Sequence, residues 1–335
     1  MFVGARDRME MQKVPQAGFP IRGLWIAGFQ RRLTLRNLWV PIKLVVSLLQ
    51  SVFLVQSFRP NVVIGTGGYA SGPLLRIAAL FGIPTLIQEQ NSYAGVTNKM
   101  LAASAKKICV AYQDMERFFP SEKIVFTGNP VRQDLVDSRI EPHMALNHFN
   151  LSTHPSQPEQ RAQGPVLLVL GGSLGAGRIN TLIGEKLDFF RAHNIRVLWQ
   201  CGAYYYNDYK HLECPGLRIV PFIDQMSMAY SVADIIISRS GALSVSELAL
   251  VGKPVLFIPS PNVAEDHQTK NAQALVDQKA ALMIKEADLA LEFEATFKRL
   301  CEDKSLSASL GQAIKATAMP NATTDIVDQL KGLCL

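Results

Sequence analysis

Residues 234–268 read Asp-Ile-Ile-Ile-Ser-Arg-Ser-Gly-Ala-Leu-Ser-Val-Ser-Glu-Leu-Ala-Leu-Val-Gly-Lys-Pro-Val-Leu-Phe-Ile-Pro-Ser-Pro-Asn-Val-Ala-Glu-Asp-His-Gln. An apolar segment at 235–237 predicts a strand, which runs through a Gly-containing turn into a helix that carries Glu247. A second apolar strand, 255–258, opens into a polar loop and another helix near Asp266. Strands and helices that alternate in this way are typical of a parallel α/β sheet.

The strand ends of this stretch are suited to binding phosphate. A helix that starts directly after a strand presents free backbone N–H groups and a positive dipole end. A nearby carboxylate such as Glu247 can accept the hydroxyl groups of a ribose, as an acidic residue does in dinucleotide-binding folds. The combination predicts a nucleotide-diphosphate site. The alternative is an ordinary α/β domain, in which Gly and Ser at strand ends bind nothing.

Two upstream loops of the same kind favour the nucleotide site. The apolar strand 165–170 leads into Gly171-Gly-Ser-Leu-Gly-Ala-Gly177 and a helix. Further upstream, Val62-Val-Ile-Gly-Thr-Gly-Gly-Tyr-Ala-Ser-Gly-Pro73 precedes a helix that Pro73 would open and Gly82 would close. None of the three loops has the P-loop spacing or the full dinucleotide fingerprint, which disfavours a P-loop ATPase and a nicotinamide dehydrogenase.

The composition indicates a globular protein of two domains. The chain has 335 residues, of which 48% are hydrophobic and 19% are charged. Its five cysteines are scattered without C-x-x-C spacing, which favours a reducing compartment over a disulfide framework or a zinc site. No signal peptide is expected, because the first ten residues already carry charges and no apolar segment follows them.

The positive charge is concentrated in the first quarter of the chain. The net charge is +6, and residues 11–88 contain eight basic side chains and no acidic one. Within this region, residues 22–39 interleave arginines with large apolar side chains, a pattern that suits an anionic membrane surface. The alternative is an amphipathic helix packed on the core, and nucleic acid is disfavoured because no recognised binding module is present. The predicted membrane residues are Trp25, Phe29, Arg31, Arg32 and Arg36.

The apolar run at 44–55 is a candidate for a membrane span. Between Lys43 and Arg59 it offers about fifteen residues, interrupted by Gln50 and Gln56, whereas a span needs roughly twenty. The sequence therefore predicts a buried helix of the α/β domain here, in a protein that lies on the membrane without crossing it.

Strand and helix signals repeat in two halves. A polar segment at 152–164 reads as a surface loop, and the hinge is expected near Asn129-Pro-Val-Arg132. We expect domains at 1–131 and 132–335, with the last helix crossing back to the first domain. The predicted strands lie near 61–65, 84–88, 107–111, 123–127, 165–170, 195–200, 217–220, 234–238, 254–258 and 280–284. The predicted helices of the first half lie near 38–58, 72–82, 95–105 and 112–118.

Several motifs, in order along the chain, resemble those of a known family. They are Gly65-Thr-Gly-Gly-Tyr-Ala-Ser-Gly-Pro73, Gln88-Glu-Gln-Asn-Ser-Tyr-Ala-Gly95, Thr127-Gly-Asn-Pro-Val-Arg132, Gly171-Gly-Ser173 and Ser238-Arg-Ser-Gly-Ala-Leu-Ser-Val-Ser-Glu247. Together they resemble the MurG family, which adds N-acetylglucosamine to undecaprenyl-diphosphate-MurNAc-pentapeptide (lipid I) to give lipid II. The resemblance implies the GT-B fold, which has two doubly wound Rossmann-like α/β domains facing a cleft.

The resemblance also implies roles for individual residues. The diphosphate of UDP-N-acetylglucosamine would be held at Gly172 and Ser173 and by N–H groups of Ala242, Leu243, Ser244, Val245 and Ser246. The main chain of Ile223 would read uracil, Glu247 would bind ribose, Gln268 and Asn91 would contact the sugar, and Arg132 would lie near the donor. The acceptor diphosphate would meet Gly67, Gly68, Tyr69 and Ser71.

The implied partners are UDP-N-acetylglucosamine, undecaprenyl-linked lipid I and an anionic membrane surface, with no nucleic acid. The implied location is peripheral, on the cytoplasmic face of the plasma (inner) membrane, with a role in cell-wall synthesis, cell shape and cell division. No Asp-x-Asp motif occurs, so neither a metal nor another cofactor is expected.

The sequence departs from the family at one point. The family opens with a strand and a Gly-rich loop, G-G-T-G-G-H, whose histidine is the proposed base, whereas Met1-Phe-Val-Gly resembles the family's second strand. We therefore expect the first domain to lack its first strand, the catalytic residue to be unassigned, and this chain to show little or no transferase turnover. Three alternatives are a UDP-sugar epimerase of the same fold, a non-catalytic UDP-sugar or lipid-precursor binding protein, and a dehydrogenase. The six histidines, none in a matching context, are His143, His148, His154, His193, His211 and His267.

Overall fold

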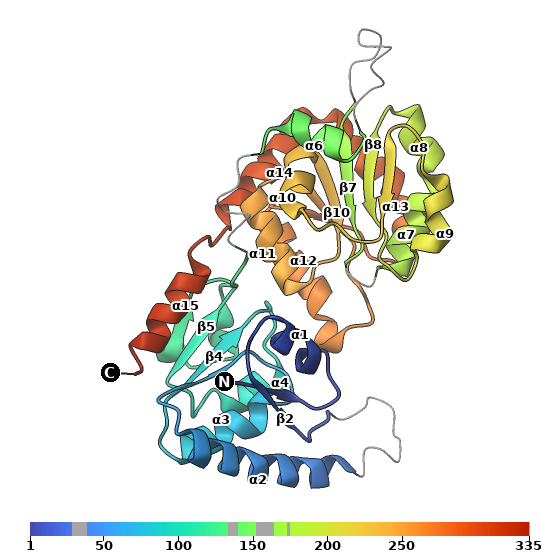
Figure 1. Ribbon diagram of the computed structural model, residues 1–335. Helices are drawn as coiled ribbons and strands as arrows, with labels where there is room; N and C mark the ends of the chain where they lie inside the picture. Colours follow the sequence, from blue (N-terminus) through green and yellow to red (C-terminus); the bar gives the residue numbers. More distant parts are fainter. Residues whose placement is uncertain (29–38, 133–139, 152–163, 173–174, 335) are drawn as a thin grey trace. The chain divides into compact units, whose positions relative to one another are not determined.

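The computed structural model describes residues 1–28, 39–132, 140–151, 164–172 and 175–334 (Figure 1). The chain forms two compact units, one of residues 1–128 with 321–335 and one of residues 129–320. The first unit thus ends at Gly128, close to the hinge expected near Asn129, and the C-terminal segment belongs to it.

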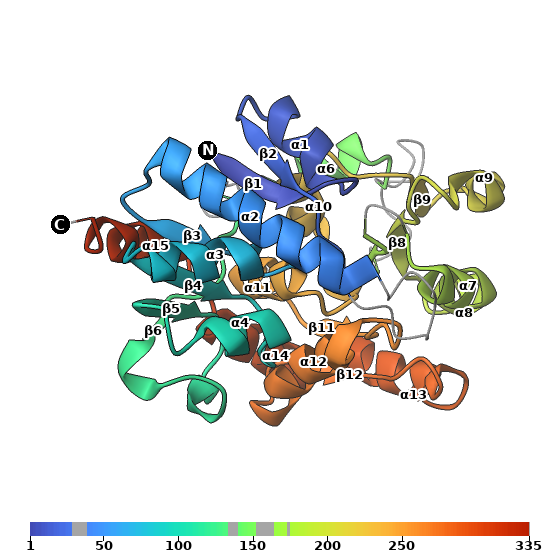
Figure 2. The same ribbon diagram turned by 90° about the horizontal axis from the view of Figure 1, so that it is seen from below.

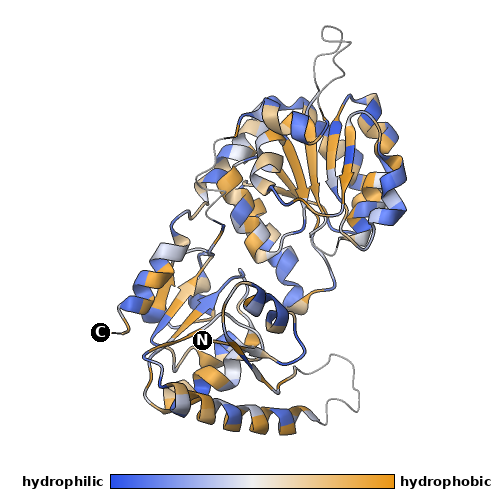
Figure 3. Cartoon of the chain, in the orientation of Figure 1, coloured by the Kyte–Doolittle hydropathy of each residue, from blue (hydrophilic) through white to orange (hydrophobic). Residues whose placement is uncertain are grey.

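The second unit is built on a six-stranded parallel sheet with the order β12-β11-β10-β7-β8-β9. The chain moves from β7 outward to β9 and then returns to the other side of β7 with β10, which makes the sheet doubly wound. Its central strands are fully buried and almost wholly apolar, because helices cover both faces (Figures 1 and 3). The strands are β7 (Val166–Leu170), β8 (Arg196–Gln200), β9 (Leu217–Val220), β10 (Ile235–Ser238), β11 (Val255–Phe257) and β12 (Leu282–Met283).

Helices connect these strands, and most begin soon after a strand ends. They are α6 (Pro142–His148), α7 (Gly177–Glu185), α8 (Leu187–Ala192), α9 (Tyr206–Tyr209), α10 (Met226–Val232), α11 (Ala242–Val251), α12 (His267–Asp277), α13 (Leu289–Glu302) and α14 (Lys304–Ala316). The core between them is aromatic, with Phe190, Phe293 and Phe297 in mutual ring contact. Trp199 is fully buried there, and its indole N–H donates to Asn180 Oδ1 at 3.0 Å, so its polar atom is satisfied.

The first unit contains two separate parallel sheets. Strands β1 (Phe2–Ala5) and β2 (Ile21–Leu24) form a pair. The other sheet has the order β3-β4-β5-β6 and consists of β3 (Val63–Gly65), β4 (Thr85–Glu89), β5 (Lys107–Val110) and β6 (Ile124–Phe126). The helices are α1 (Glu10–Gln16), α2 (Val40–Phe58), α3 (Ser71–Leu80), α4 (Val96–Leu101) and α15 (Ala322–Lys331).

The C-terminal helix packs on the four-stranded sheet of the first unit. Ile326 of α15 contacts Leu86 of β4 and Cys109 of β5, and all three side chains are buried. Strand β2 and helix α1 were not predicted from the sequence. The helix predicted near 112–118 is only a short 3-10 turn, Met115–Arg117.

A cavity of about 840 Å³ lies between β1 and β3, the neighbouring strands of the two sheets. Its lining includes Val3 of β1, Ile64 of β3 and Val55 of α2. The side chain of Glu10 also lines it and accepts a hydrogen bond from the Ala5 N–H at 3.1 Å. Within the described residues, no ladder of hydrogen bonds joins β1 to β3.

The prediction that residues 44–55 form a buried helix is wrong. They belong to α2, which exposes many apolar side chains, with Leu49 65% and Phe53 71% exposed. Its buried residues include Ser47 and Ser51, whose hydroxyls donate to backbone carbonyls one turn earlier and are therefore satisfied within the helix. Figure 2 shows α2 alongside α3, and the two helices are in contact.

In the part of the chain that the structure describes, α2 is also the one helix long and apolar enough to cross a membrane by length and composition. Core helices of soluble proteins pass the same test, but only 22% of the apolar window of α2 is buried.

Candidate functional site

The candidate site lies at the carboxyl edge of the sheet in the second unit. Strand β10 pairs with β7 on one side and with β11 on the other, so the loops that follow these three strands meet at one edge. The winding direction changes between β7 and β10, and ligands of doubly wound sheets bind at such a switch point. The predicted donor residues after β7 and β10 therefore lie at the place that the fold favours for a ligand.

The loop after β7 needs glycine for steric reasons. Gly172 and Gly175 have φ of 76° and 85°, in the left-handed region. A Cβ on Gly171 would lie 2.8 Å from the Gln200 carbonyl oxygen, and one on Gly175 would lie 2.3 Å from that of Cys201. Glycine therefore lets the backbone turn tightly here and pack closely against the residues at the end of β8. Ser173 lies outside the described residues.

The N-terminus of α11 is open to a ligand. Gly241 precedes the helix in an extended conformation, and no side chain caps the first turn. The N–H groups of Ala242, Leu243 and Ser244 therefore remain available to an anion. The prediction for Val245 needs correction, because its N–H donates to the Gly241 carbonyl at 2.9 Å and its side chain is buried. Ser246 contributes its hydroxyl, which donates to the Ala242 carbonyl and accepts from Asn129 Nδ2.

Glu247 and Arg132, both predicted, lie close together. The Arg132 Nε atom is 4.0 Å from Glu247 Oε1. On its other oxygen, Glu247 faces the hydroxyl of Tyr230 in α10 at 3.4 Å, a residue that the sequence did not point to. Burial, reinforced by the charge of Glu247, raises the pKa of Tyr230 far above its ordinary range, so the phenol stays protonated and can donate.

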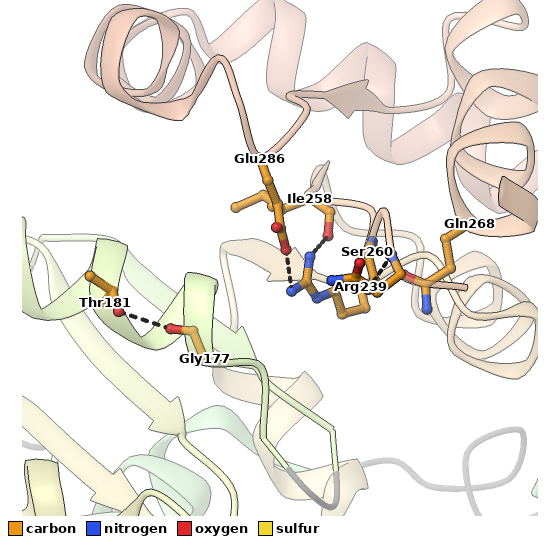
Figure 4. A network of polar contacts seen from close by, with 8 residues as sticks. Gly177, Thr181, Arg239, Ile258, Ser260, Gln268 and Glu286 are labelled. Atoms are coloured by element: carbon orange, nitrogen blue, oxygen red, sulfur yellow. Dashed lines mark hydrogen bonds and ion pairs between the residues drawn. The ribbon is translucent and has the colours of Figure 1, made fainter. Parts of the chain in front are cut away.

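Gln268, at the start of α12, joins the loops that follow β10 and β11. Its Oε1 accepts from the Ser260 N–H at 2.9 Å, and its backbone carbonyl accepts from the Ser240 hydroxyl at 2.8 Å. Arg239 lies in the same polar network with Glu286 (Figure 4). Since Oε1 is used as an acceptor, the Nε2 amide group is the part of Gln268 suited to a sugar hydroxyl.

Two other residues of the second unit are Ile223, itself a predicted donor residue, and His267, which precedes the predicted donor residue Gln268 in sequence. Ile223 follows β9 and is only 2% exposed, and the uracil contact of its main chain stays a prediction. The Nδ1 atom of His267 lies 2.7 Å from the Ala264 carbonyl oxygen. No group of three His, Cys, Asp or Glu side chains within the described residues could hold a metal ion.

The first unit holds a second Gly-rich loop, between β3 and α3. Gly67 and Gly68 have φ of 87° and 77°, and Ser71 donates to the Gly67 carbonyl at 2.6 Å. Tyr69 is 48% exposed beside them. The predicted acceptor residues therefore share one loop at the N-terminus of a ten-residue helix, whose first turn has no capping side chain.

Asn91 is held by a buried carboxylate at the end of β4. Glu89 is 1% exposed and accepts hydrogen bonds from the N–H groups of Asn91 and Gly95 and from Asn98 Nδ2, at 2.8–3.1 Å. Asn98 Oδ1 is buried without a hydrogen-bond partner in the described structure. Glu89, the last residue of β4, was not predicted to have a role, although it lies within the motif at residues 88–95.

The predicted membrane residues are mostly outside the described structure. This applies to Phe29, Arg31, Arg32 and Arg36. Trp25 is described, and its backbone N–H donates to Gln50 Oε1 of α2 at 2.9 Å, while the Lys43 Nζ atom of α2 lies 5.4 Å from its ring centroid. Trp25 is thus attached to α2.

Comparisons with known proteins identify the family. Residues 1–110 match the glycosyltransferase family 28 N-terminal domain, and residues 166–329 match the glycosyltransferase family 28 C-terminal domain. A relative from Flavobacterium psychrophilum is 54% identical over 98% of this chain and 88% of its own length. Another from Christiangramia forsetii is 51% identical over 99% and 88%. Both are named UDP-N-acetylglucosamine–N-acetylmuramyl-(pentapeptide) pyrophosphoryl-undecaprenol N-acetylglucosamine transferase.

Solved structures agree with this assignment. The crystal structure of Acinetobacter baumannii MurG matches with a TM-score of 0.79 at 29% identity, covering 98% of this chain and 90% of that one. A UDP-N-acetylglucosamine 2-epimerase matches with a TM-score of 0.61 at 15% identity, which shows a common fold alone. The predicted GT-B fold is confirmed, and the chain belongs to the MurG family of glycosyltransferases.

Proposed function

We propose that this protein transfers N-acetylglucosamine from UDP-N-acetylglucosamine to the C4 hydroxyl of undecaprenyl-diphosphate-MurNAc-pentapeptide, converting lipid I to lipid II in peptidoglycan synthesis. The observation that carries the proposal is the 54% identity, over 98% of the chain, to a relative that bears the name of this transferase. The arrangement of the carboxyl edge of the second unit supports it independently of any name.

The donor is proposed to bind at that edge. The diphosphate meets the N–H groups of the first turn of α11 and the backbone at Gly172, and these dipoles stabilise the charge that grows as UDP leaves. Glu247 accepts the ribose hydroxyls, and the Tyr230 hydroxyl behind it fixes the orientation of the carboxylate. Arg132 beside Glu247 adds positive charge near the donor.

The transfer itself is proposed to invert the anomeric carbon. The acceptor oxygen forms a bond to C1 of the sugar while the bond from C1 to the diphosphate oxygen breaks on the opposite face. The acceptor hydroxyl gives up its proton to a base, and that base is left unassigned among the described residues. The acceptor diphosphate is proposed to meet Gly67, Gly68, Tyr69 and Ser71 at the start of α3, and Asn91 to contact the transferred sugar.

The protein is proposed to bind the cytoplasmic face of the plasma membrane through the exposed side of α2. One side of this helix packs on its unit, so it can offer only the other side to lipid, as an interfacial helix does. Lys43 and Arg59 flank its apolar run, in a region without acidic residues. This proposal moves the centre of the membrane surface from residues 22–39 to α2.

The test is transfer of labelled N-acetylglucosamine from UDP-N-acetylglucosamine to a lipid I analogue. We expect a labelled disaccharide lipid that forms only when the acceptor is present, with UDP released in equal amount. Conversion of the sugar nucleotide to an epimer without acceptor would support the epimerase alternative and contradict the proposal. Binding of UDP with no transfer at any acceptor concentration would support a binding protein.

A further inference from the structure

A largely buried ion pair lies at the carboxyl edge of the second unit, and the donor contacts proposed above do not include it. Arg239 directly follows β10, and its Nη2 atom lies 2.5 Å from Glu286 Oε1. Its Nη1 atom donates to the Ile258 carbonyl at 2.9 Å. The side chains of Arg239 and Glu286 are only 17% and 21% exposed. Figure 4 shows the guanidinium of Arg239 between Glu286 and Ile258.

This one guanidinium joins the ends of three adjacent strands. Arg239 follows β10, Ile258 follows β11, and Glu286 lies just after β12. In the sheet, β11 lies between β10 and β12. Strand β12 has only two residues and is an edge strand, so the ladder by itself anchors its end weakly. The contacts of Arg239 therefore reinforce the sheet where its own hydrogen bonds end.

The segments that Arg239 holds lead directly into the proposed donor groups. The next residue, Ser240, donates to the Gln268 carbonyl and accepts at its own carbonyl from Asn271 Nδ2 at 3.2 Å. Two residues after Ile258, the Ser260 N–H donates to Gln268 Oε1. Both anchored segments thus converge on Gln268, and one of them also continues into the N-terminus of α11.

The loop between Ile258 and Gln268 contains two residues in an unfavourable backbone conformation. Glu265 and Asp266 have φ of 54° and 49°, in a region that side-chain-bearing residues seldom adopt. Such residues persist only where their surroundings hold them, and they cluster at ligand sites. Gln268 follows this pair by two residues, so its position depends on how firmly the loop is held at Ile258.

We propose that Arg239 and Glu286 form a clamp that positions the donor loops, so that Arg239 acts as a positioning residue for nucleotide-sugar binding through Gln268 and the first turn of α11. The proposal rests on the donor site proposed above. A planar guanidinium contacts a carboxylate and a backbone carbonyl with separate nitrogens in a fixed geometry. A lysine ammonium would keep the charge but lose this pair of fixed donors.

The experiment measures UDP binding by calorimetry, together with KM and kcat for UDP-N-acetylglucosamine, in the full chain. Arg239→Lys is expected to raise the UDP Kd and the KM roughly tenfold, the scale of losing a hydrogen bond to a charged group, with the binding stoichiometry unchanged. Glu286→Gln keeps the shape of the side chain and one acceptor oxygen, so a smaller increase of the UDP Kd and the KM is expected. Lys186→Met breaks the Lys186–Glu294 ion pair (2.6 Å) elsewhere in the same unit and serves as the control.

Non-additivity tests whether the two residues act as one unit. The double variant Arg239→Ala/Glu286→Ala is expected to bind UDP no more weakly than Arg239→Ala alone. A lower Tm or lower stoichiometry with unchanged Kd in the active fraction would show a purely structural pair and overturn the proposal. Unchanged Kd and KM in Arg239→Lys would overturn it as well. Failure of the unsubstituted protein to bind UDP would instead refute the donor site, and with it the basis of the clamp.

Discussion

At the scale of single residues, the donor site depends on how one carboxylate is held. Glu247 is partly exposed and faces Arg132 on one oxygen and Tyr230 on the other. We expect Glu247→Ala to weaken UDP binding by roughly 1–3 kcal/mol, because hydrogen bonds to a charged group are lost. Calorimetry checks this, with Glu294→Ala on the exposed side of α13 as the control. Equal affinity in the two variants would remove Glu247 from the ribose role.

Tyr230 allows a subtler test of the same site. Tyr230→Phe removes only the hydroxyl, so the packing of α10 is kept while Glu247 loses a neutral donor. We expect a several-fold increase in the Kd for UDP, smaller than the effect of Glu247→Ala, because a neutral hydrogen bond is worth about 1 kcal/mol. The same loss should disappear in the Glu247→Ala background. A loss that persists there would mean that Tyr230 acts by another route.

At the scale of elements, α2 is notable because it is apolar and yet exposes many of its large apolar side chains. Its apolar side faces outward, which is costly in water unless another apolar phase covers it. We expect Leu49→Ser/Phe53→Ser to reduce sedimentation with anionic vesicles at least several-fold, because apolar contact area is lost. Leu291→Ser, at a residue 87% exposed on α13, should leave sedimentation unchanged.

Salt and lipid charge separate the two contributions to that binding. If Lys43 and Arg59 assist α2, raising the salt concentration or replacing anionic by neutral lipid should weaken binding of the unsubstituted protein. Vesicle binding that changes neither with salt concentration nor with lipid charge would contradict the electrostatic contribution and leave only the apolar one.

The two separate sheets of the first unit lead to a second prediction at this scale. Strands β1 and β3 line a cavity of about 840 Å³, and Ile64 of β3 is 39% exposed. By contrast, every residue of β7 and β10 is buried in the middle of six strands. We expect amide hydrogen exchange to be faster in β1 and β3 than in β7 and β10, because edge strands open at lower free energy. Equal protection in the two sets would mean that the cavity does not loosen these edges.

At the scale of the whole molecule, the buried thiol of Cys109 and the partly buried thiol of Cys301 link stability to alkaline pH. Burial raises the pKa of Cys109 and of Cys301 to about 11, against 9.0 for an ordinary thiol. The folded state therefore holds these protons more tightly than the unfolded chain does. The resulting stability is fully present below pH 9 and is lost as the pH rises toward 11.

We expect the free energy of unfolding, measured in urea, to fall over this pH window. The fall should be shallower in a Cys109→Ala/Cys301→Ala variant, once each curve is referred to its own value at neutral pH. Buried tyrosines such as Tyr230 add to the loss above pH 10. An equal slope in the variant would show that other groups dominate.

Much of the fold could be predicted because its signals are local. Apolar runs such as 235–237 followed by Gly-rich turns and helices indicate a parallel α/β sheet, and in such a sheet the strand ends must share one edge. The local pattern therefore placed Gly172 and Glu247 at that edge, and the family resemblance added Gln268. The order of the motifs likewise pointed to the MurG family, which the relatives confirm.

The tertiary structure alone decided which distant residues meet and which face of a helix is covered. Arg239 and Glu286 meet only because β12 lies beyond β11 in the sheet, and Tyr230 reaches Glu247 only through the packing of α10. The hydropathy of α2 showed that the helix is apolar, but it did not show which side of the helix faces the protein. Ser47 and Ser51 can be buried because their hydroxyls donate to backbone carbonyls within the helix. Local periodicity is set by neighbours in sequence, whereas these contacts depend on strand order and packing, which no short stretch of sequence contains.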